Sequence, residues 1–584
     1  MTKNQILYER EARYDAMFFP KFPITLTKGQ GATVWDAMDQ EYLDCTSSFG
    51  VMGVGYSNPL VQERIASQLD KMTTCHHLYS NDVRGEFLEK LMKITPTAME
   101  KAYLCNSGTE AVEAAIKVAV AVSGKTKFAA CTGSFHGLTI GSTGLVSNET
   151  QRIPFKKIIH EAQFVNRNDI DSLQATIDED TALFFVELIQ ANDGATVLSP
   201  EFIQAARELT AKTGTLMVID EVCTGFCRTG NWFATPQYGI IPDCITIAKS
   251  FGGGLPFGAL LMKEEIASRF PKRLHSNTFG GNPLVLAAGL GAIEFAESEK
   301  LWEKARYHGE KLWKYLESIP NITQIKGKGL LIGIDFNTDS QAVTQHLLEK
   351  HRILVIPRAK GILFMPPLVI TKNEVERIGE AVQKTFESPT KPKISAAEFY
   401  TKIAGEYDSL AISKTPYLDE SVKILKKYNH FEGSLLDVGC GTGLLKQILG
   451  EHFEYTGIDP TPDMAKSAQD RGYHQVIVGT SEEVLPQVSD QSYDIVVALG
   501  SLLYVQDIES VMKHLRRIAK KAFLITLDDV PSDFIRDFAC KVYNHSRISV
   551  PDAKEDYRLF AWRSPSLDIP VYCRLIYVCP NILV

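Results

Sequence analysis

Two hydrophobic patterns alternate along residues 24–386, and together they predict a repeated strand–helix arrangement. Short β-branched and aromatic runs such as LFFVEL (183–188) and TLMVID (215–220) are typical of buried strands. The stretch PEFIQAARELTAK (200–212) instead has the spacing of a helix with one apolar face. Because strands that alternate with helices form largely parallel sheets, we expect an α/β domain over residues 1–386.

A second series of strand candidates follows a polar break in this pattern. Residues 388–393 read SPTKPK, whose prolines and lysines suit an extended, solvated connector. We therefore place a linker at 387–395 and a second α/β domain at 396–584. Its strand candidates are SLLDVG (434–439), YTGID (455–459), QVIVG (475–479), YDIVVAL (493–499) and AFLITL (522–527).

Composition and charge narrow the functional class. The 584 residues are 45% hydrophobic and 23% charged, which is typical of a folded protein. The net charge of −8 offers no general attraction for nucleic acid or anionic lipid. The eleven cysteines contain no CxxC pair, which favours reduced thiols and argues against a metal site. The N-terminal residues MTKNQILYEREARYD are polar and charged and lack the apolar stretch of a signal peptide. No run approaches the roughly 18 apolar residues of a membrane span, so we expect a cytoplasmic enzyme.

A lysine and an aspartate stand at the ends of two predicted strands. Asp220 ends one apolar strand, and Lys249 follows another, directly before a glycine-rich turn. Residues just beyond the carboxyl ends of parallel strands line the ligand crevice of such a sheet, so the two side chains can converge. Lys249 can form an imine with an aldehyde, and Asp220 can keep a pyridine nitrogen protonated. The pair predicts pyridoxal phosphate chemistry with these two catalytic residues.

The same domain contains a candidate phosphate site and a candidate ring contact. Ser107, Gly108 and Thr109 open an alanine-rich helix, whose first backbone N–H groups favour an anion. Phe135 in SFHG offers a flat face for a cofactor ring. Each feature alone is typical of a helix cap, a solvated lysine or a core aromatic residue, and only their combination is specific.

Residues 20–386 resemble the class III pyridoxal-phosphate aminotransferases, a group that includes ornithine, acetylornithine and 4-aminobutyrate aminotransferases and glutamate-1-semialdehyde aminomutase. The motifs NSGTEA, FHG, VELIQ, IDEVCTGFCRTG, IAKSFGGGLP and NTFGGNP occur in the family order. The resemblance implies a fold-type I transferase, with a mostly parallel sheet and a small α+β subdomain, that forms a homodimer with sites at the interface. It implies that Lys249 carries the cofactor imine, Asp220 pairs with the pyridinium, Gly108 and Thr109 hold the phosphate beside Ser107, Phe135 stacks on the ring next to His136, Glu187 supports the cofactor, and Thr278 reaches the phosphate in the other subunit.

The sequence departs from this family on the substrate side. Leu363 stands where amino-acid-specific members carry an arginine that grips the substrate α-carboxylate, and Asn192 replaces the glutamate that neutralises this arginine. Losing both together is coherent, because an isolated buried glutamate is a costly charge. We infer that the acceptor is an aldehyde, a ketone, an ester or a tethered chain. Arg358 is a candidate anionic anchor, although a solvated arginine is the more ordinary interpretation, and Cys223 replaces a glutamine that faces the ring hydroxyl in many relatives.

The second domain begins with a glycine-rich loop after a strand. In SLLDVGCGTGLL, Gly439 and Gly441 permit close approach of the backbone to a ligand. Asp459 ends the next strand at the spacing at which a carboxylate meets ribose hydroxyls, which indicates a nucleoside site. The glycine pattern alone also fits nicotinamide cofactors, but Asp437 directly before the loop favours S-adenosylmethionine.

Residues 396–584 resemble the class I S-adenosylmethionine-dependent methyltransferases, which have a Rossmann-like fold. The similarity is strongest from 435 to 507. It implies that Gly439 and Gly441 approach the methionine part, Asp459 binds the ribose, Thr480 and Ser481 flank the adenine, Leu499 lines the pocket, and Tyr400 and Tyr407 belong to a lid. Many members carry an aspartate where Thr480 stands. His545 is a conceivable base, but a lone histidine is more often structural.

Together the halves predict a bifunctional biosynthetic enzyme. The first domain would transfer an amino group from a small-molecule amine donor to a carbonyl acceptor, free or bound to a carrier protein, and the second would methylate the product. The lack of an evident base favours N-methylation, since a neutral amine needs little beyond alignment. An aminomutase or epimerase fused to an O- or N-methyltransferase stays open, because relatives with those activities keep the same lysine and aspartate.

Overall fold

The computed structural model describes residues 2–16, 18–19, 21–22, 24–387, 416–502, 505, 507–529, 535–536, 540–541, 553–563 and 570–578. They form two compact units. The first consists of residues 2–4 and 24–387, and the second of the described residues from 5 to 22 and from 416 onwards. The predicted linker beyond Glu387, Tyr400, Tyr407 and His545 lie outside the described residues. Within the described parts, no helix combines the length and apolar character needed to cross a bilayer.

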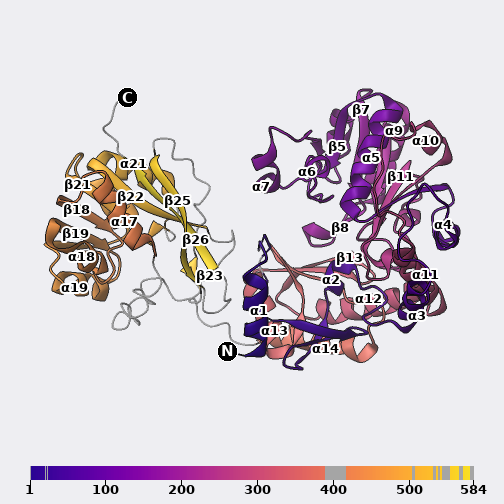
Figure 1. Ribbon diagram of the computed structural model, residues 1–584, viewed down its shortest axis with the longest axis horizontal. Helices are drawn as coiled ribbons and strands as arrows, with labels where there is room; N and C mark the ends of the chain where they lie inside the picture. Colours follow the sequence, from indigo (N-terminus) through magenta and orange to yellow (C-terminus); the bar gives the residue numbers. More distant parts are fainter. Residues whose placement is uncertain are drawn as a thin grey trace. The chain divides into compact units, whose positions relative to one another are not determined.

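A seven-stranded sheet forms the centre of the first unit (Figure 1), in the order β4-β12-β11-β10-β7-β5-β6. β12 is antiparallel to both of its neighbours, and the pairs from β11 to β6 are parallel. The strands expected at 183–188 and 215–220 are confirmed as β7 and β10. The bounds are β4 Lys101–Cys105, β5 Lys127–Cys131, β6 Gln163–Val165, β7 Thr181–Glu187, β10 Leu216–Asp220, β11 Cys244–Ala248 and β12 Gly258–Met262.

Both faces of this sheet are covered, which explains why its central strands are continuous apolar runs. Leu183 and Phe185 of β7 pack on one face against the helix α5 (Gly108–Ser123). Phe184 and Val186 point to the opposite face, towards α9 (Pro200–Thr213). The alanine-rich face of α5 lets this helix lie close to the strands, and the predicted helix at 200–212 is confirmed as α9.

Two four-stranded sheets and several helices complete the first unit. One sheet has the order β1-β2-β3-β15 and the other β13-β14-β17-β16. The strands are β1 Leu26–Gln30, β2 Thr33–Asp36, β3 Glu41–Asp44, β13 Ile322–Lys328, β14 Leu331–Phe336, β15 Ile353–Leu354, β16 Ile356–Arg358 and β17 Gly361–Phe364. The helices include α3 Pro59–Leu69, α4 Asp82–Ile94, α8 Ile170–Thr176, α10 Glu264–Arg269, α11 Pro283–Ser298, α12 Leu301–Glu317, α13 Ser340–His351 and α14 Lys372–Glu387.

These small sheets join distant parts of the chain. β15 pairs in parallel with β3 through Ile353 and Leu43. The backbone N–H of Met365 also donates a hydrogen bond of 2.7 Å to the carbonyl oxygen of Cys45. The segment after β3 is thereby held beside β17.

The second unit contains another seven-stranded sheet, in the order β20-β19-β18-β21-β22-β26-β25. The first five strands in this order are parallel, and β26 lies antiparallel between β22 and β25. All five strands expected from the sequence are confirmed. The strands are β18 Gly433–Val438, β19 Phe453–Asp459, β20 Gln475–Val478, β21 Tyr493–Ala498, β22 Ala519–Asp529, β25 Ala553–Arg563 and β26 Pro570–Val578.

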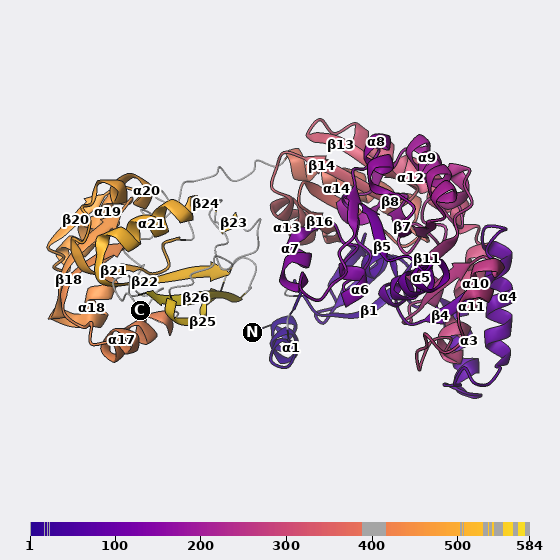
Figure 2. The same ribbon diagram turned by 90° about the horizontal axis from the view of Figure 1, so that it is seen from above.

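Helices cover both faces of this second sheet. α21 (Ile508–Ile518) packs on the face that carries Leu436 and Val496, and α18 (Leu444–Leu449) packs on the face that carries Leu435. Figure 2 shows α21 and α18 on opposite sides of the strands. The remaining helices include α17 Pro416–Lys427, α19 Pro462–Asp470 and α20 Ser481–Val484. The strand order reverses at β18, so a ligand crevice is expected at its carboxyl end.

Candidate active sites

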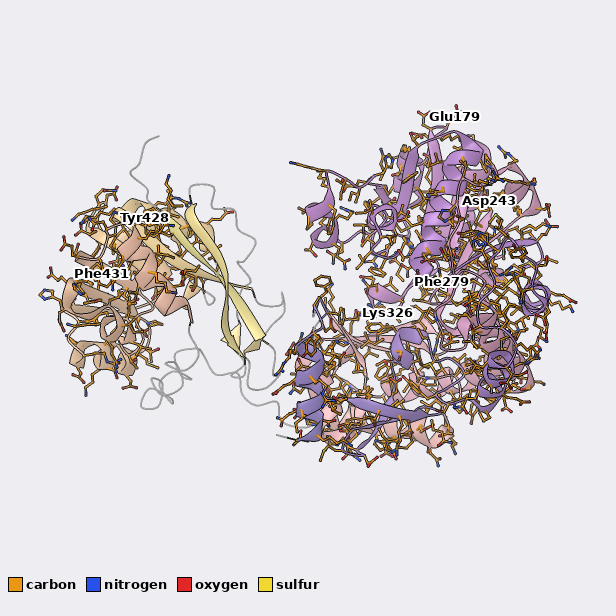
Figure 3. All side chains as sticks on the ribbon, in the orientation of Figure 1. Glu179, Asp243, Phe279, Lys326, Tyr428 and Phe431 are labelled. Atoms are coloured by element: carbon orange, nitrogen blue, oxygen red, sulfur yellow. The ribbon has the colours of Figure 1, made fainter. Side chains whose placement is uncertain are left out.

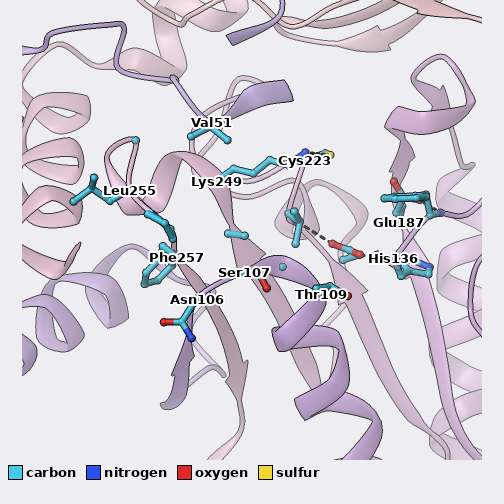
Figure 4. A pocket seen from close by; sticks show the side chains of 18 residues that line it. Val51, Asn106, Ser107, Thr109, His136, Glu187, Cys223, Lys249, Leu255 and Phe257 are labelled. Carbon is cyan, nitrogen blue, oxygen red and sulfur yellow. Dashed lines mark hydrogen bonds and ion pairs between the residues drawn. The ribbon is translucent and has the colours of Figure 1, made fainter. Parts of the chain in front are cut away.

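A cavity of about 460 Å³ lies at the carboxyl ends of β7, β10 and β11, beside the start of α5 (Figure 4). Eight residues that the sequence assigns to the cofactor site line it. They are Ser107, Gly108, Thr109, Phe135, His136, Glu187, Asp220 and Lys249. Parallel strands end at one edge of their sheet, which is why residues more than a hundred positions apart meet here.

Lys249 opens a single turn of 3-10 helix, Lys249–Gly252, directly after β11. Its φ of 55° lies in the left-handed region. This conformation is unfavourable for residues other than glycine and is often found at functional positions. Its Nζ donates a hydrogen bond of 2.8 Å to Sγ of Cys223, as Figure 4 shows. Burial raises the pKa of the Cys223 thiol, and the charge of Lys249 opposes this. The lysine amine thus faces the centre of the cavity.

Asp220, His136 and Glu187 form a buried polar group at the other end of the cavity. Asp220 and Glu187 are register partners on neighbouring parallel strands. Oδ2 of Asp220 lies 2.7 Å from Nδ1 of His136, whose Nε2 is buried without a partner among the described residues. Burial raises the pKa of Glu187 to about 7, His136 lowers it, and Asp220 raises it further. The carboxylates of Asp220 and Glu187 make this end of the cavity a suitable place for a positively charged group of a ligand.

The start of α5 forms a cradle for an anion. Oγ of Ser107 accepts a hydrogen bond of 3.3 Å from the N–H of Glu110, while the N–H groups of Gly108 and Thr109 have no partner within the helix. A Cβ at Gly137 would lie 2.3 Å from Oγ1 of Thr109, so the chain can approach here only as glycine. The amine of Lys249 suits the aldehyde of pyridoxal phosphate, the carboxylates suit its ring nitrogen, and the start of α5 suits its phosphate. These residues therefore fit this cofactor.

Some residues at this cavity were not found from the sequence, and one predicted residue is not part of it. Val51 and Asn106 line the cavity. Asn106 begins the NSGTEA motif, and Val51 lies in the segment 31–59, GATVWDAMDQEYLDCTSSFGVMGVGYSNP, which also resembles the family. A signal therefore existed for both residues, but neither was given a role. Thr278 is exposed and does not line this cavity. Its role at the site of a partner subunit stays a prediction.

The glycine-rich loop of the second unit follows β18. Gly439 and Gly441 have φ values of 78° and 52°, which favour glycine. A Cβ at Gly439 would lie 2.2 Å from Cβ of Ser501. Asp459 ends β19 and accepts hydrogen bonds of 2.9 Å from the N–H groups of Gly441 and Thr461. A carboxylate has about four acceptor positions, so Asp459 can still accept ribose hydroxyls while it holds the loop.

Asp437 is buried beneath this loop. Its Oδ2 accepts a hydrogen bond of 2.6 Å from the hydroxyl of Tyr473, a residue that the sequence did not suggest. Burial raises the pKa of Asp437 to about 7, the Tyr473 hydrogen bond lowers it, and Asp459 raises it. Asp437 therefore supports the loop from inside the domain, and its direct contact with a cofactor stays a prediction.

The predicted adenine contacts lie at the start of α20. Thr480 is the N-cap and forms a capping box with Glu483, to which its Oγ1 donates at 2.9 Å. Ser481 is the first residue of α20, and Leu499 follows β21 and packs against the domain core. These three residues lie at the ends of β20 and β21. Among the residues that the structure describes, no three His, Cys, Asp or Glu side chains are grouped to hold a metal ion.

Comparison with known protein families decides what these sites belong to. The family described as "Aminotransferase class-III" matches residues 16–386, which is more than half of the chain. The chain belongs to the class-III aminotransferases. A "Methyltransferase domain" matches residues 436–525, so this aminotransferase also carries a methyltransferase domain. Class-III aminotransferases use pyridoxal phosphate, and methyltransferase domains of this type use S-adenosylmethionine.

Curated relatives and solved structures resemble the aminotransferase part. The LysW-aminoadipate semialdehyde transaminase of Deinococcus radiodurans is 35% identical over 65% of this chain and 89% of its own length. The acetylornithine aminotransferase of Methanosarcina mazei is 37% identical over 64% of this chain and 95% of its own length. The crystal structure of ornithine aminotransferase from Toxoplasma gondii covers 66% of this chain and 96% of its own, with a TM-score of 0.63 and 27% identity.

The two positions at which the family pattern predicts a charge pair carry no charge in this chain. Leu363 is fully buried on β17 and belongs to a cluster with Ile356 and Met365, against which Cys223 packs. Asn192, at the position of the missing glutamate, is exposed.

Arg358 corrects one expectation. A solvated arginine was the more ordinary interpretation, but Arg358 is half-buried and its Nε is fully buried without a partner among the described residues. The reason is that β16 pairs with β17, with Arg358 opposite Gly361, and this register draws the stem of the side chain inward.

Proposed function

We propose that this aminotransferase aminates a carbonyl substrate that is not held by the usual α-carboxylate grip, and that its methyltransferase domain methylates the nitrogen of the product. One observation carries the first part. Leu363 fills the position of the gripping arginine with a fully buried apolar side chain. A free α-carboxylate placed against it would lose its hydration without gaining a partner.

The residues of the first cavity have separate roles in this proposal. Lys249 would hold the cofactor through its aldehyde group, and its free amine would carry the proton at the reacting substrate carbon. Asp220, oriented by His136, balances the positive charge of the ring nitrogen. The N–H groups of Gly108 and Thr109 bind the phosphate. The bound cofactor supplies an electron-withdrawing ring that stabilises negative charge on the substrate carbon.

An aldehyde, a ketone, an ester or a tethered chain is the proposed acceptor class. One relative is named for a semialdehyde with a LysW prefix, and this supports an aldehyde acceptor and a carrier-bound chain as candidates here. The exposed side chain of Asn192 adds no charge that would select a free amino acid.

For the methyltransferase domain we propose N-methylation. Transfer to a neutral amine needs alignment and exclusion of water more than a strong base. Gly439 and Gly441 would approach the methionine part, Asp459 would bind the ribose, Thr480 and Ser481 would flank the adenine, and Leu499 would line the pocket.

We further propose a cytoplasmic homodimer, in which Thr278 of one subunit completes the phosphate site of the other. The exposure of Thr278 is compatible with a contact to a second chain. The domains would extend over residues 1–386 and 396–584, joined by the linker at 387–395.

The deciding experiment follows both groups by mass. Purified protein is incubated with pyridoxal phosphate, ¹⁵N-labelled amine donors, methyl-deuterated S-adenosylmethionine and a panel of carbonyls. Lys249→Ala and Asp459→Ala each inactivate one domain. We expect one product that gains both labels in the unmodified protein and only one label, or none, in each variant. Labels on unrelated compounds would refute tandem action, and an isomerised substrate without ¹⁵N would favour the aminomutase or epimerase.

A further inference from the structure

A second cavity of about 370 Å³ lies in the first unit and has a positive lining. It includes the side chains of Arg167, Lys326, Arg358 and Lys360 against the carboxylates of Asp193 and Asp335. Lys326, labelled in Figure 3, projects from β13. Four cationic side chains against two carboxylates leave an excess of two positive charges around one cavity.

Burial and pairing together single out Arg358, because Lys360, which also lacks an ion pair among the described residues, is exposed. Arg167 is paired with Asp193, and Nζ of Lys326 lies 2.8 Å from Oδ2 of Asp335. For Arg358, no carboxylate lies within ion-pair distance among the residues that the structure describes. One Nη of its guanidinium donates a hydrogen bond of 3.3 Å to the carbonyl oxygen of Pro357, and its Nε is buried without a partner. A half-buried guanidinium left in this state costs free energy that an anion would recover.

The strand that carries Arg358 packs next to the cavity that contains Lys249, because Ile356 of β16 belongs to the apolar cluster against which Cys223 packs, and Cys223 lines that cavity. Burial lowers the pKa of Arg358, and the thiol of Cys223 and the carboxylate of Glu187, which both line that first cavity, oppose this. The backbone connects the two cavities as well, because the N–H of Ala191 donates to Oε2 of Glu187 at 3.3 Å and the next residue, Asn192, lines the second cavity. A substrate whose carbonyl group lies at Lys249 therefore has a cationic site near its other end.

We propose that the second cavity binds an anionic group of the carbonyl substrate and that Arg358 is its anchor. The ligand is a carboxylate or phosphate that lies on the substrate at a distance from the reacting carbonyl. This inference rests on the proposed transamination and names the substrate class for it. The anchor stands on β16, whereas Leu363 on the neighbouring β17 excludes the usual grip.

A pair of aldehydes of equal length tests the anchor. Succinic semialdehyde carries a carboxylate at the position where butanal carries a methyl group. With the complete enzyme and its cofactor, we expect kcat/KM for succinic semialdehyde to exceed that for butanal, mainly through KM. Arg358→Leu should lower the value for succinic semialdehyde by about 10- to 100-fold and leave butanal within a factor of about two, since a charged hydrogen bond to a buried partner is lost.

Two further variants separate an anchor from a general charge effect. Arg358→Lys keeps the charge but loses the bidentate geometry of the guanidinium. Its kcat/KM for succinic semialdehyde should therefore lie between the values of the unmodified enzyme and of Arg358→Leu. Lys328→Leu removes an exposed cation from the same small sheet outside both cavities, and it should change neither substrate. Equal losses with both aldehydes in Arg358→Leu, or equal losses in Arg358→Leu and Lys328→Leu, would overturn the proposal.

Anion binding gives a readout that does not depend on turnover. Glutarate and inorganic phosphate are titrated calorimetrically into the holoenzyme, and the stronger of the two identifies the preferred anion. We expect Arg358→Leu to weaken that binding by at least about tenfold. Unchanged binding would overturn the anchor even if amination continues. Loss of amination for every carbonyl, with anion binding intact, would instead refute the proposed function and leave the anion site standing.

Discussion

The replacement Asp437→Asn tests the electrostatics beneath the methyltransferase loop. Burial raises the pKa of Asp437 from an ordinary value of 3.8 to about 7. Between pH 3.8 and pH 7, Asp437 therefore keeps its proton in the folded domain and loses it in the unfolded chain. Stability that depends on this proton is present below pH 4 and is lost as the pH rises towards 7. Asparagine has the shape of the protonated acid, and its oxygen can still accept from Tyr473.

The magnitude follows from the same two values. Their difference corresponds to about 4 kcal/mol at pH 8, which is an upper bound because water entry or local opening relieves part of the cost. We expect Asp437→Asn to be more stable than the unmodified domain at pH 8, by up to this amount. At pH 5, which is about one unit above the ordinary pKa, the same bound falls to less than about 2 kcal/mol, so the two proteins should differ by less than half as much as at pH 8.

Amide hydrogen exchange of peptides that contain β18 measures this difference within the full-length protein. Exchange is compared at pH 5 and pH 8 after correction for the intrinsic rates. Asp494→Asn is a control for which we expect the opposite change in stability at pH 8. Burial alone would raise the pKa of Asp494, but hydrogen bonds from Ser434 and Lys521 lower it, so this variant should lose stability at pH 8. Equal protection of Asp437→Asn and the unmodified protein at both pH values would refute the reasoning.

Three further predictions concern single side chains. Lys249→Ala should abolish the visible absorbance of bound pyridoxal phosphate while the far-ultraviolet circular dichroism is unchanged, and retained absorbance would contradict its role. Gly439→Ala should weaken S-adenosylmethionine binding by at least about tenfold in calorimetry, because its Cβ would lie 2.2 Å from Cβ of Ser501. The matched control Gly85→Ala, with nothing within 4 Å of the added Cβ, should bind normally. Leu363→Arg should destabilise the first unit by about 3–5 kcal/mol in urea unfolding, since it buries an unpaired charge, and an unchanged midpoint would contradict this.

Local sequence patterns were sufficient for several strands and for the candidates Lys249, Asp220, Phe135 and the start of α5, whereas His136 and Glu187 came from the family resemblance. The runs at 183–188 and 215–220 became β7 and β10 because both faces of those strands are buried. The convergence of Asp220 and Lys249 followed from strand ends alone. Tyr473 was missed because its position depends on packing between segments far apart in the chain, which no local pattern records. For Tyr473, the partner Asp437 lies 36 positions earlier.

Two of the residues that depart from the class-III pattern lie close together in the structure. Cys223 follows β10 and Leu363 lies on β17, more than a hundred positions later, yet both belong to one apolar cluster with Met365. The cofactor side keeps its amine, carboxylates and helix start but has Cys223 in place of a glutamine. At the two positions of the family's charge pair, Leu363 replaces an arginine and Asn192 replaces a glutamate, so both charges are absent. We expect these replacements to change which carbonyl compound is accepted and to leave the chemistry at Lys249 intact. If Arg358 on the adjoining β16 then holds the anionic end of that compound, the enzyme has moved its charge recognition away from the reacting carbon, as a substrate with a distant carboxylate or phosphate requires.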